Sequence, residues 1–273
     1  MRAPPVLLRT RLSNTAEIEL WPAALLRARG NDDARALARA ETVLRRKRDG
    51  RYLAAVRRDG LQALVPRLAR EPGLDAALDL IDDHTPPHGR MPPPLPLHRL
   101  HERLHALGLD ADAYAARSGL ALVAEPAWLL LADIDRFGRP LWLLPSAGRA
   151  WQAMRRAAAA DGLVLDAISG YRSHDYQLGI VTRKLARGQT LEQILTVNAA
   201  PGYSEHHAGD ALDIGTPGEP PAEESFERTP AFAWLQAQAA RFGFALSYPR
   251  DNPHGIVYEP WHWRWHPASP HAS

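Results

Sequence analysis

The sequence contains no cysteine at any of its 273 positions. This absence excludes a disulfide framework, a cysteine nucleophile and a thiolate metal site, so a bound metal would have to be held by histidine, aspartate or glutamate. No apolar run approaches the roughly 18 residues that a transmembrane helix needs. The first residues show no recognisable signal peptide, because Arg9 and Arg11 cut off the short apolar patch there. Serine hydrolysis is not indicated either, because Ser169 and Ser204 lie outside any Gly-x-Ser-x-Gly motif.

Charge is distributed unevenly along the chain. Apolar residues make up 45% and charged residues 23%, an ordinary composition for a globular chain with its own core. The net charge is only +2, yet residues 1–60 hold 14 basic residues against 7 acidic ones. Such a segment can contact nucleic acid, anionic lipid or an anionic wall polymer. Because no nucleic-acid motif or interleaved aromatic residues accompany it, we expect a solvated surface and no nucleic-acid partner.

A proline-rich stretch divides the sequence. Residues 1–85 have Ala-, Arg- and Leu-rich patterns that predict a helical accessory segment. Residues 86–96 predict a stiff, extended linker. Residues 97–273 predict a second unit, with the chemically informative motifs concentrated in residues 163–265.

The C-terminal unit alternates between short strands and helices. Helices are predicted over residues 147–161, 174–187, 190–196 and 230–242, and strands over residues 163–168, 211–214, 244–248 and 257–265. The order shows no regular strand-helix-strand repeat. We therefore expect an α+β fold in which helices flank a small antiparallel sheet, preceded by a mainly helical N-terminal segment.

His206 and Asp213 are the first candidate metal ligands. They lie seven residues apart, and Gly209 between them permits a turn that brings both side chains to one point. An imidazole and a carboxylate suit a catalytic zinc ion, which takes three protein ligands and keeps a fourth position for water. His207 is treated as a non-ligand, because adjacent residues rarely bind one metal together.

His262 is the candidate third ligand, and Glu259 is the candidate general base for a metal-bound water. Strict alternation along a strand would direct their side chains to opposite faces. Pro260 lies between them, and proline is confined to the starts, edges and bulges of strands. We therefore expect Glu259 to lie in the approach to the strand, on the metal's side.

The order of these motifs resembles that of the zinc D-alanyl-D-alanine carboxypeptidases of the VanY type, which have the Hedgehog/DD-peptidase fold. The resemblance rests on Ser204-x-His206-x-x-Gly209-x-Ala211-x-Asp213, on Glu259-x-x-His262, and on the upstream run Ser169-Gly170-Tyr171-Arg172-Ser173 with Gln177. It spans about residues 169–265, and residues 1–90 are not covered by it.

The resemblance implies a role for each matched residue. His206, Asp213 and His262 match the ligands of one zinc ion, and Glu259 matches the catalytic base. Arg172 matches the arginine that faces the reacting carbonyl, where a guanidinium stabilises a developing oxyanion. The expected substrate-binding residues are Ser204, Gln177, Tyr171, Tyr203 and Trp261, of which Trp261 could equally belong to the core.

The resemblance also implies a substrate class. We expect a monomeric zinc carboxypeptidase that removes the terminal D-alanine from a peptidoglycan stem peptide or muropeptide, with the D-Ala-D-Ala bond favoured. Cleavage of a diaminopimelate–D-Ala bond, cleavage of an L-Ala-D-Glu bond, and a non-catalytic zinc-containing wall-binding module remain alternatives. A wall substrate implies the periplasm or cell envelope, whereas the first residues, taken as the true start, imply the cytoplasm.

Overall fold

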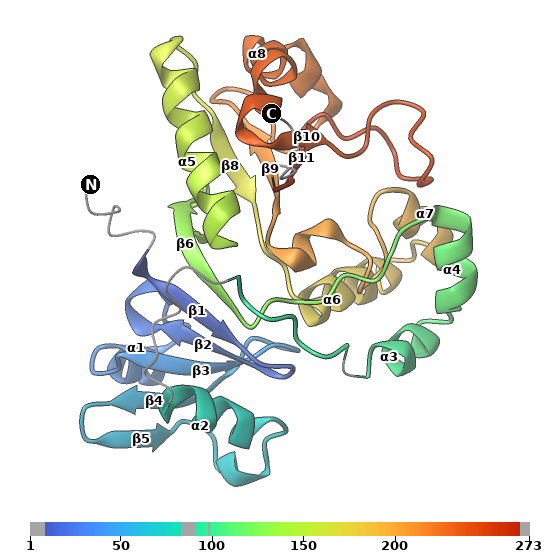
Figure 1. Ribbon diagram of the computed structural model, residues 1–273. Coiled ribbons are helices and arrows are strands. Elements are labelled where there is room, and N and C mark those ends of the chain that lie inside the picture. Colours follow the sequence, from blue (N-terminus) through green and yellow to red (C-terminus); the bar gives the residue numbers. More distant parts are fainter. Residues whose placement is uncertain (1–8, 83–90, 98, 268–273) are drawn as a thin grey trace.

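The computed structural model describes residues 9–82, 91–97 and 99–267, which form two antiparallel sheets with helices packed against them (Figure 1). The larger sheet has the strand order β5-β4-β3-β2-β1-β6-β7. Its strands are Arg11–Asn14 (β1), Ile18–Pro22 (β2), Thr42–Arg46 (β3), Tyr52–Arg57 (β4), Gly60–Ala63 (β5), Trp128–Ile134 (β6) and Pro140–Leu143 (β7). The smaller sheet has the order β10-β11-β9-β8. Its strands are Asp166–Ser169 (β8), Ala211–Gly215 (β9), Phe244–Leu246 (β10) and His262–Trp265 (β11).

The prediction of a mainly helical N-terminal segment is wrong. Residues 34–56, which have an Ala- and Arg-rich helical pattern, form the end of α1 (Asn31–Leu37) and then the hairpin β3–β4. Gly50 lies in the turn with a φ of 68°, a conformation that interrupts a helix. Burial of Leu44 and Leu53 in one core cluster and of Val43 in another outweighs the helix propensity of alanine and arginine. Farther along this segment, β5 and a 3-10 turn (Leu68–Arg70) precede the helix α2 (Leu74–Asp82).

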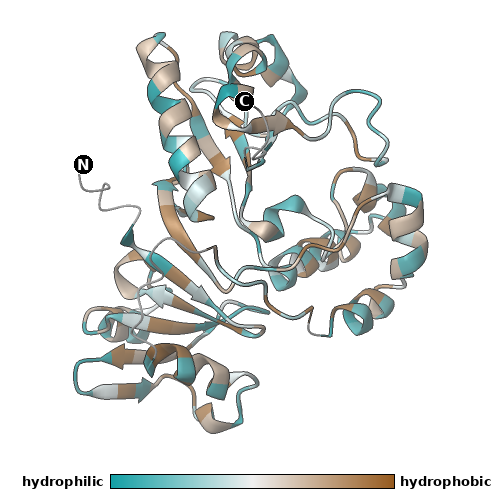
Figure 2. Ribbon diagram, viewed as in Figure 1, coloured by the Kyte–Doolittle hydropathy of each residue, from teal (hydrophilic) through white to brown (hydrophobic). Residues whose placement is uncertain are grey.

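The larger sheet joins the two sides of the predicted linker. β1 pairs with β6, so the N-terminal strands and β6–β7 form one continuous sheet. The strand β6 lies between the two halves of the molecule and is almost entirely apolar (Figure 2). Residues 86–90 of the predicted linker lie outside the described residues. Its remaining part is extended, and Pro94 forms an isolated bridge with Pro126.

The predicted α+β class is confirmed, and the C-terminal elements lie close to their expected positions. The helices of this half are α3 (Leu100–Ala106), α4 (Ala111–Ser118), α5 (Pro145–Ala160), α6 (His174–Leu185), α7 (Leu191–Thr196) and α8 (Pro230–Gln238). One core cluster packs α5 and α8 against both sheets, with Trp151 and Leu212 fully buried. A second cluster joins α3 and α4 to Tyr203 and Tyr248. The first cluster thus holds the small sheet in the core, and the second fixes the chain segments around Tyr203 and Tyr248.

The described part of the chain contains no helix with the length and apolar character that crossing a membrane requires.

Candidate metal centre

His206, Asp213 and His262 meet at one end of the small sheet. His206 lies in the 3-10 turn Glu205–Ala208 (η4), Asp213 on β9 and His262 on β11, where His262 is the direct cross-strand partner of Asp213. All three residues are buried, and one ligand atom from each lies within 4.8 Å of the others. The structure therefore brings together the three residues predicted as metal ligands.

Gly209 lets η4 turn back toward the sheet. It has a φ of 71°, and a Cβ atom there would lie 2.4 Å from Leu129 Cδ2 on β6. Its carbonyl also accepts a hydrogen bond from the backbone nitrogen of Leu144 at 2.7 Å. Only glycine allows this left-handed conformation together with such a close approach, and the turn places His206 beside Asp213.

Outer hydrogen bonds orient both imidazoles. His206 Nδ1 lies 2.8 Å from the carbonyl oxygen of Gly170, and His262 Nε2 lies 2.9 Å from Glu205 Oε2. The other ring nitrogens face Asp213 Oδ1, at 3.4 Å from His206 Nε2 and 3.0 Å from His262 Nδ1. Tetrahedral zinc with bonds of about 2.1 Å holds its ligand atoms roughly 3.4 Å apart. The donor set, its spacing and its outer hydrogen bonds therefore fit a zinc ion.

The charges around His262 also favour a cation. Burial alone would lower the pKa of His262, but hydrogen bonds to Asp213 and Glu205 raise it to about 10. Burial alone would raise the pKa of Asp213, but the charge and hydrogen bond of His206 and the hydrogen bond of His262 hold it well below its usual range. Burial likewise opposes ionisation of Glu205, yet the hydrogen bond from His262 lowers its pKa to about 2. Ionised carboxylates thus surround a centre that attracts positive charge.

Glu259 lies beside this centre, ahead of β11, as predicted from Pro260. Its Oε2 atom is 4.0 Å from His262 Nδ1, and its backbone nitrogen donates to the carbonyl of Tyr248 at 3.0 Å. Burial raises the pKa of Glu259 to about 7. Such a carboxylate can exchange protons near neutral pH, which suits a general base.

A cavity of about 300 Å³ opens over the three ligands and Glu259. Arg172, Gln177, Ser204 and Trp261 all line it, as expected for residues that contact a substrate. The Nη1 atom of Arg172 donates to Gln177 Oε1 at 2.8 Å, and Gln177 Nε2 donates to the carbonyl of Ala199. Gln177 therefore holds the guanidinium in place rather than offering a free amide.

Tyr171 and Tyr203, which were predicted to bind substrate, do not line this cavity. Tyr171 donates its hydroxyl to Glu125 Oε2 at 2.6 Å, on the other side of the Arg172 loop. Tyr203 is 2% exposed and donates its hydroxyl to the carbonyl of Ala111. Each is the chain neighbour of a cavity residue, and successive side chains of an extended segment point in opposite directions.

The sequence prediction missed Glu205 and the residues behind it. Arg264 Nη1 lies 3.2 Å from Glu205 Oε1, and its Nη2 lies 3.3 Å from Asp210 Oδ2. The series of contacts from Asp210 through Arg264 and Glu205 thus fixes the imidazole of His262, a candidate metal ligand. A carboxylate directly beside a histidine ligand was an available signal, because ligating histidines commonly bond a carboxylate through their other nitrogen.

A second buried network holds the Arg172 loop from the N-terminal side. Lys47 Nζ lies 2.5 Å from Glu125 Oε2, and Asn14 Nδ2 donates to the hydroxyl of Tyr171 at 2.8 Å. Glu125 Oε1 accepts a bond from the backbone nitrogen of His174 at 2.8 Å. These bonds fix the loop on both sides of Arg172.

Comparisons with known proteins match the part of the chain that holds this site. Residues 141–268 match the family model VanY, D-alanyl-D-alanine carboxypeptidase. The putative carboxypeptidase YodJ of Bacillus subtilis is 33% identical over 150 residues, which are 52% of this chain and 54% of that protein. The bifunctional D-Ala-D-Ala dipeptidase and carboxypeptidase VanXYC of Enterococcus gallinarum is 31% identical over 148 residues, which are 52% of this chain and 75% of that protein.

A solved structure of the LdcB LD-carboxypeptidase is 32% identical, with a TM-score of 0.48, and the match covers 52% of this chain and 69% of that one. The chain spans about half the length of YodJ and 28% and 42% of the D-alanyl-D-alanine carboxypeptidases of Enterococcus faecium and Enterococcus faecalis. The N-terminal strands lie outside the residues matched by the family model.

Proposed function

The chain belongs to the VanY family of D-alanyl-D-alanine carboxypeptidases, and from this premise we propose that it is a zinc-dependent carboxypeptidase. Its substrate would be a peptidoglycan stem peptide, from which it removes the terminal D-alanine. The observation that carries the proposal is the meeting of Glu259 with the cluster His206, Asp213 and His262 in one cavity that Arg172 also lines.

One zinc ion, held by His206, Asp213 and His262, would lower the pKa of a bound water and polarise the scissile carbonyl. Glu259 takes a proton from the attacking water and passes it to the nitrogen of the leaving D-alanine. Arg172 stabilises the negative charge that develops on the carbonyl oxygen, and Gln177 keeps the guanidinium in position. Ser204 lines the same cavity and can bond the terminal carboxylate of the peptide.

The D-Ala-D-Ala bond of a pentapeptide is the preferred substrate bond in this proposal, in line with the activity named for the family. Because all of the proposed machinery lies on one chain, a monomer suffices for activity. A wall peptide as substrate further implies that the enzyme acts in the cell envelope.

Release of D-alanine tests the proposal directly. The zinc-loaded protein is incubated with a D-Ala-D-Ala pentapeptide and, separately, with the tetrapeptide that ends in diaminopimelate–D-Ala, each with and without a chelator. We expect chelator-sensitive release from the pentapeptide. Release from the tetrapeptide alone would instead assign an L,D-carboxypeptidase, and release that survives complete metal removal would overturn the zinc mechanism.

The substitution Glu259→Ala separates the base from the ligands. A general base contributes about 10²–10⁴-fold to rate, so release should fall by at least 100-fold while one zinc ion per chain stays bound. Metal content is measured by elemental analysis of the purified variant. Loss of zinc from this variant would show that Glu259 acts as a ligand.

A further inference from the structure

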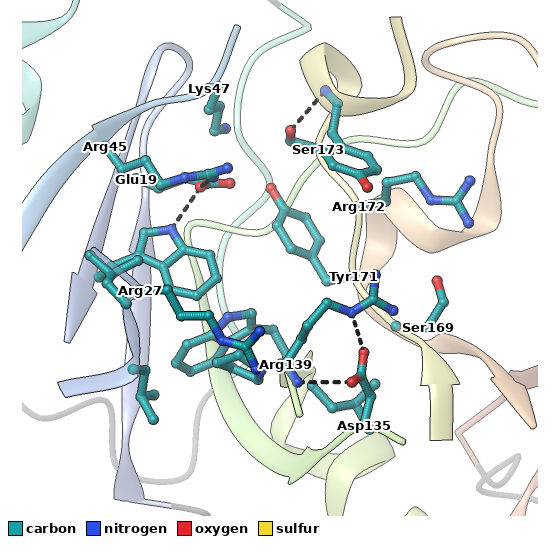
Figure 3. Close-up of a pocket in the computed structure, with 18 of the residues that line it drawn as sticks. Glu19, Arg27, Arg45, Lys47, Asp135, Arg139, Ser169, Tyr171, Arg172 and Ser173 are labelled. Carbon is teal, nitrogen blue, oxygen red and sulfur yellow. Dashed lines mark hydrogen bonds and ion pairs between the residues drawn. The ribbon is translucent and has the colours of Figure 1, made fainter. Parts of the chain in front are cut away.

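A second and larger cavity, of about 470 Å³, lies between the N-terminal sheet and the Arg172 loop (Figure 3). Figure 3 shows Glu19, Arg45 and Lys47 on the side of the sheet, Ser169 and Ser173 on the other side, and Tyr171 between them. Glu19, Arg45 and Lys47 lie outside the family match, which begins at residue 141. This cavity therefore lies between the N-terminal segment and the motif run of residues 169–173.

Alternation along the strands explains why this face of the sheet is polar. On β2, Ile18 and Leu20 pack with α2 on one face, whereas Glu19 and Trp21 line the cavity on the other. Glu19 is the direct cross-strand partner of Arg45 on β3. One face of the sheet thus packs into the core, and the opposite face lines the cavity.

The cavity carries an excess of positive charge. Its charged lining residues are Arg27, Arg29, Arg45, Lys47, Arg139 and Arg172 against Glu19 and Asp135. Three of the cations are neutralised locally, because Arg45 pairs with Glu19 at 2.6 Å, Arg139 with Asp135 at 2.6 Å, and Lys47 with Glu125.

Of the three remaining cations, Arg172 bonds Gln177 beside the metal cavity, and Arg27 and Arg29 lie on the side of the N-terminal segment. Their side-chain hydrogen bonds go to backbone carbonyls, from Arg27 to Gly138 at 3.0 Å and from Arg29 to Gly50 at 2.8 Å. Within the described residues, neither guanidinium has a carboxylate within ion-pairing distance. The Nη2 atoms of Arg29 and Arg45 also crowd the same glycine, at 3.1 and 2.7 Å from the position of a Gly50 Cβ atom. Like charges this close favour binding of an anion.

Aromatic rings line part of the cavity. Trp21 and Trp142 pack edge to face with their ring centroids 5.3 Å apart, and Arg29 lies over Tyr52. Trp142 is 3% exposed, and its indole nitrogen has no hydrogen-bond partner. This lining suits a ligand that combines a carboxylate with a peptide or sugar body.

Arg172 lines both cavities, so they meet at this residue. Its guanidinium points away from the Arg27 and Arg139 side in Figure 3 and bonds Gln177 beside the metal ligands. A peptide with its C-terminal end in the metal cavity would have to pass Arg172 to place its preceding residues in the larger cavity.

We propose that the larger cavity is a subsite for a free carboxylate in the N-terminal part of the peptide substrate, with Arg27 and Arg29 as the recognising cations. In a stem peptide this group is the α-carboxylate of the D-glutamate residue, whose γ-carboxyl forms the chain. The inference rests on the proposed function, because it assumes a wall peptide in the metal cavity. It assigns to the N-terminal segment a part in choosing the substrate.

Binding of two matched pentapeptides tests the subsite. One carries D-glutamate with its α-carboxylate free, and the other carries the α-amide in its place. Their affinities are measured by titration calorimetry on the full-length, zinc-loaded Glu259→Ala protein, which keeps both cavities and does not consume the peptide. We expect the acid to bind at least tenfold more tightly than the amide, equal to about 1.4 kcal/mol.

The double variant Arg27→Ala/Arg29→Ala in the same background should lose this preference, because affinity for the acid falls to that for the amide. The matched control is Arg35→Ala/Arg58→Ala, which removes two charges from the same segment at side chains that are 79% and 94% exposed. The control should keep the wild-type preference. Circular dichroism confirms that each variant is folded.

The outcomes separate this subsite from the proposed function. Equal affinity for acid and amide, or a preference that survives the double variant, overturns the subsite. The wild-type protein is assayed in parallel for release of D-alanine from the acid. A preference for the acid without release of D-alanine overturns the proposed function and leaves the subsite. Release of D-alanine without that preference overturns the subsite and leaves the proposed function.

Discussion

Lowering the pH should weaken the fold through one buried ion pair. Lys47 on the N-terminal side and Glu125 before β6 are 4% and 5% exposed, and their charged atoms are 2.5 Å apart. Burial alone would raise the pKa of Glu125, but the charge and hydrogen bond of Lys47, with His174 and Tyr171, lower it to about 2. The ordinary value for a glutamate is 4.5.

The sign and size of the effect follow from this difference. A carboxyl whose pKa is lower in the folded state than in the unfolded state stabilises the fold above the unfolded value. The stabilisation is fully present above about pH 4.5 and is lost as the pH falls toward 2. At 1.36 kcal/mol per pH unit, its full size is about 3 kcal/mol.

Urea unfolding of the wild type and of Glu125→Gln, at pH values from 7 to 3, measures this term. The free energy of unfolding of the variant should be lower by about 3 kcal/mol at pH 7. The gap should narrow as the pH falls below 4.5, because the wild-type carboxyl then becomes protonated. Glu102→Gln, which removes an exposed pair with Arg99, is the control and should cost less than about 1 kcal/mol at every pH. A gap of constant size from pH 7 to pH 3 would refute this reasoning.

Two further substitutions test the metal centre and its turn. Glu205→Gln should lower zinc affinity by about 10–100-fold, because it weakens the hydrogen bond that orients His262. The control Glu192→Gln changes an exposed residue and should leave the affinity unchanged. Both affinities are measured by competition titration with a chromophoric chelator. Gly209→Ala should lower the free energy of unfolding by about 1–3 kcal/mol more than Gly188→Ala, as measured by thermal unfolding. Both glycines have positive φ, but only a Cβ atom at Gly209 would meet Leu129. Equal losses at the two glycines would rule out the close contact with β6 as the cause.

The residues of the candidate metal site could be predicted from local patterns together with the order of the family motifs. The Gly209 turn brings His206 and Asp213 together within eight residues, and Pro260 moves Glu259 out of the strand. The remaining step, the pairing of His262 with Asp213 across two strands, is a long-range contact that only the family motif indicated. Local chemistry and a known motif order were therefore sufficient for this part of the site.

The N-terminal sheet could not be predicted in the same way. Alanine and arginine favour helices in isolation, and the strands are stabilised by partners far along the chain, such as β1 with β6. The directions of Tyr171 and Tyr203 depend on the same long-range packing. The local sequence around Tyr171 and Tyr203 does not distinguish them from residues that line the metal cavity. Burial of Tyr171 against Glu125 is visible only once the N-terminal sheet is in place.

The N-terminal segment and the metal centre are therefore physically coupled. Asn14 and Lys47 reach Tyr171 and Glu125, and these residues hold the backbone on both sides of Arg172. Arg172 in turn donates a hydrogen bond from its backbone nitrogen to the carbonyl of the candidate ligand His206 at 3.1 Å. Displacing the buried ion pair Lys47–Glu125 costs free energy, because each separated charge would lie in the interior without a partner and without solvent. The sheet that shapes the larger cavity thus also fixes the arginine at the junction of both cavities.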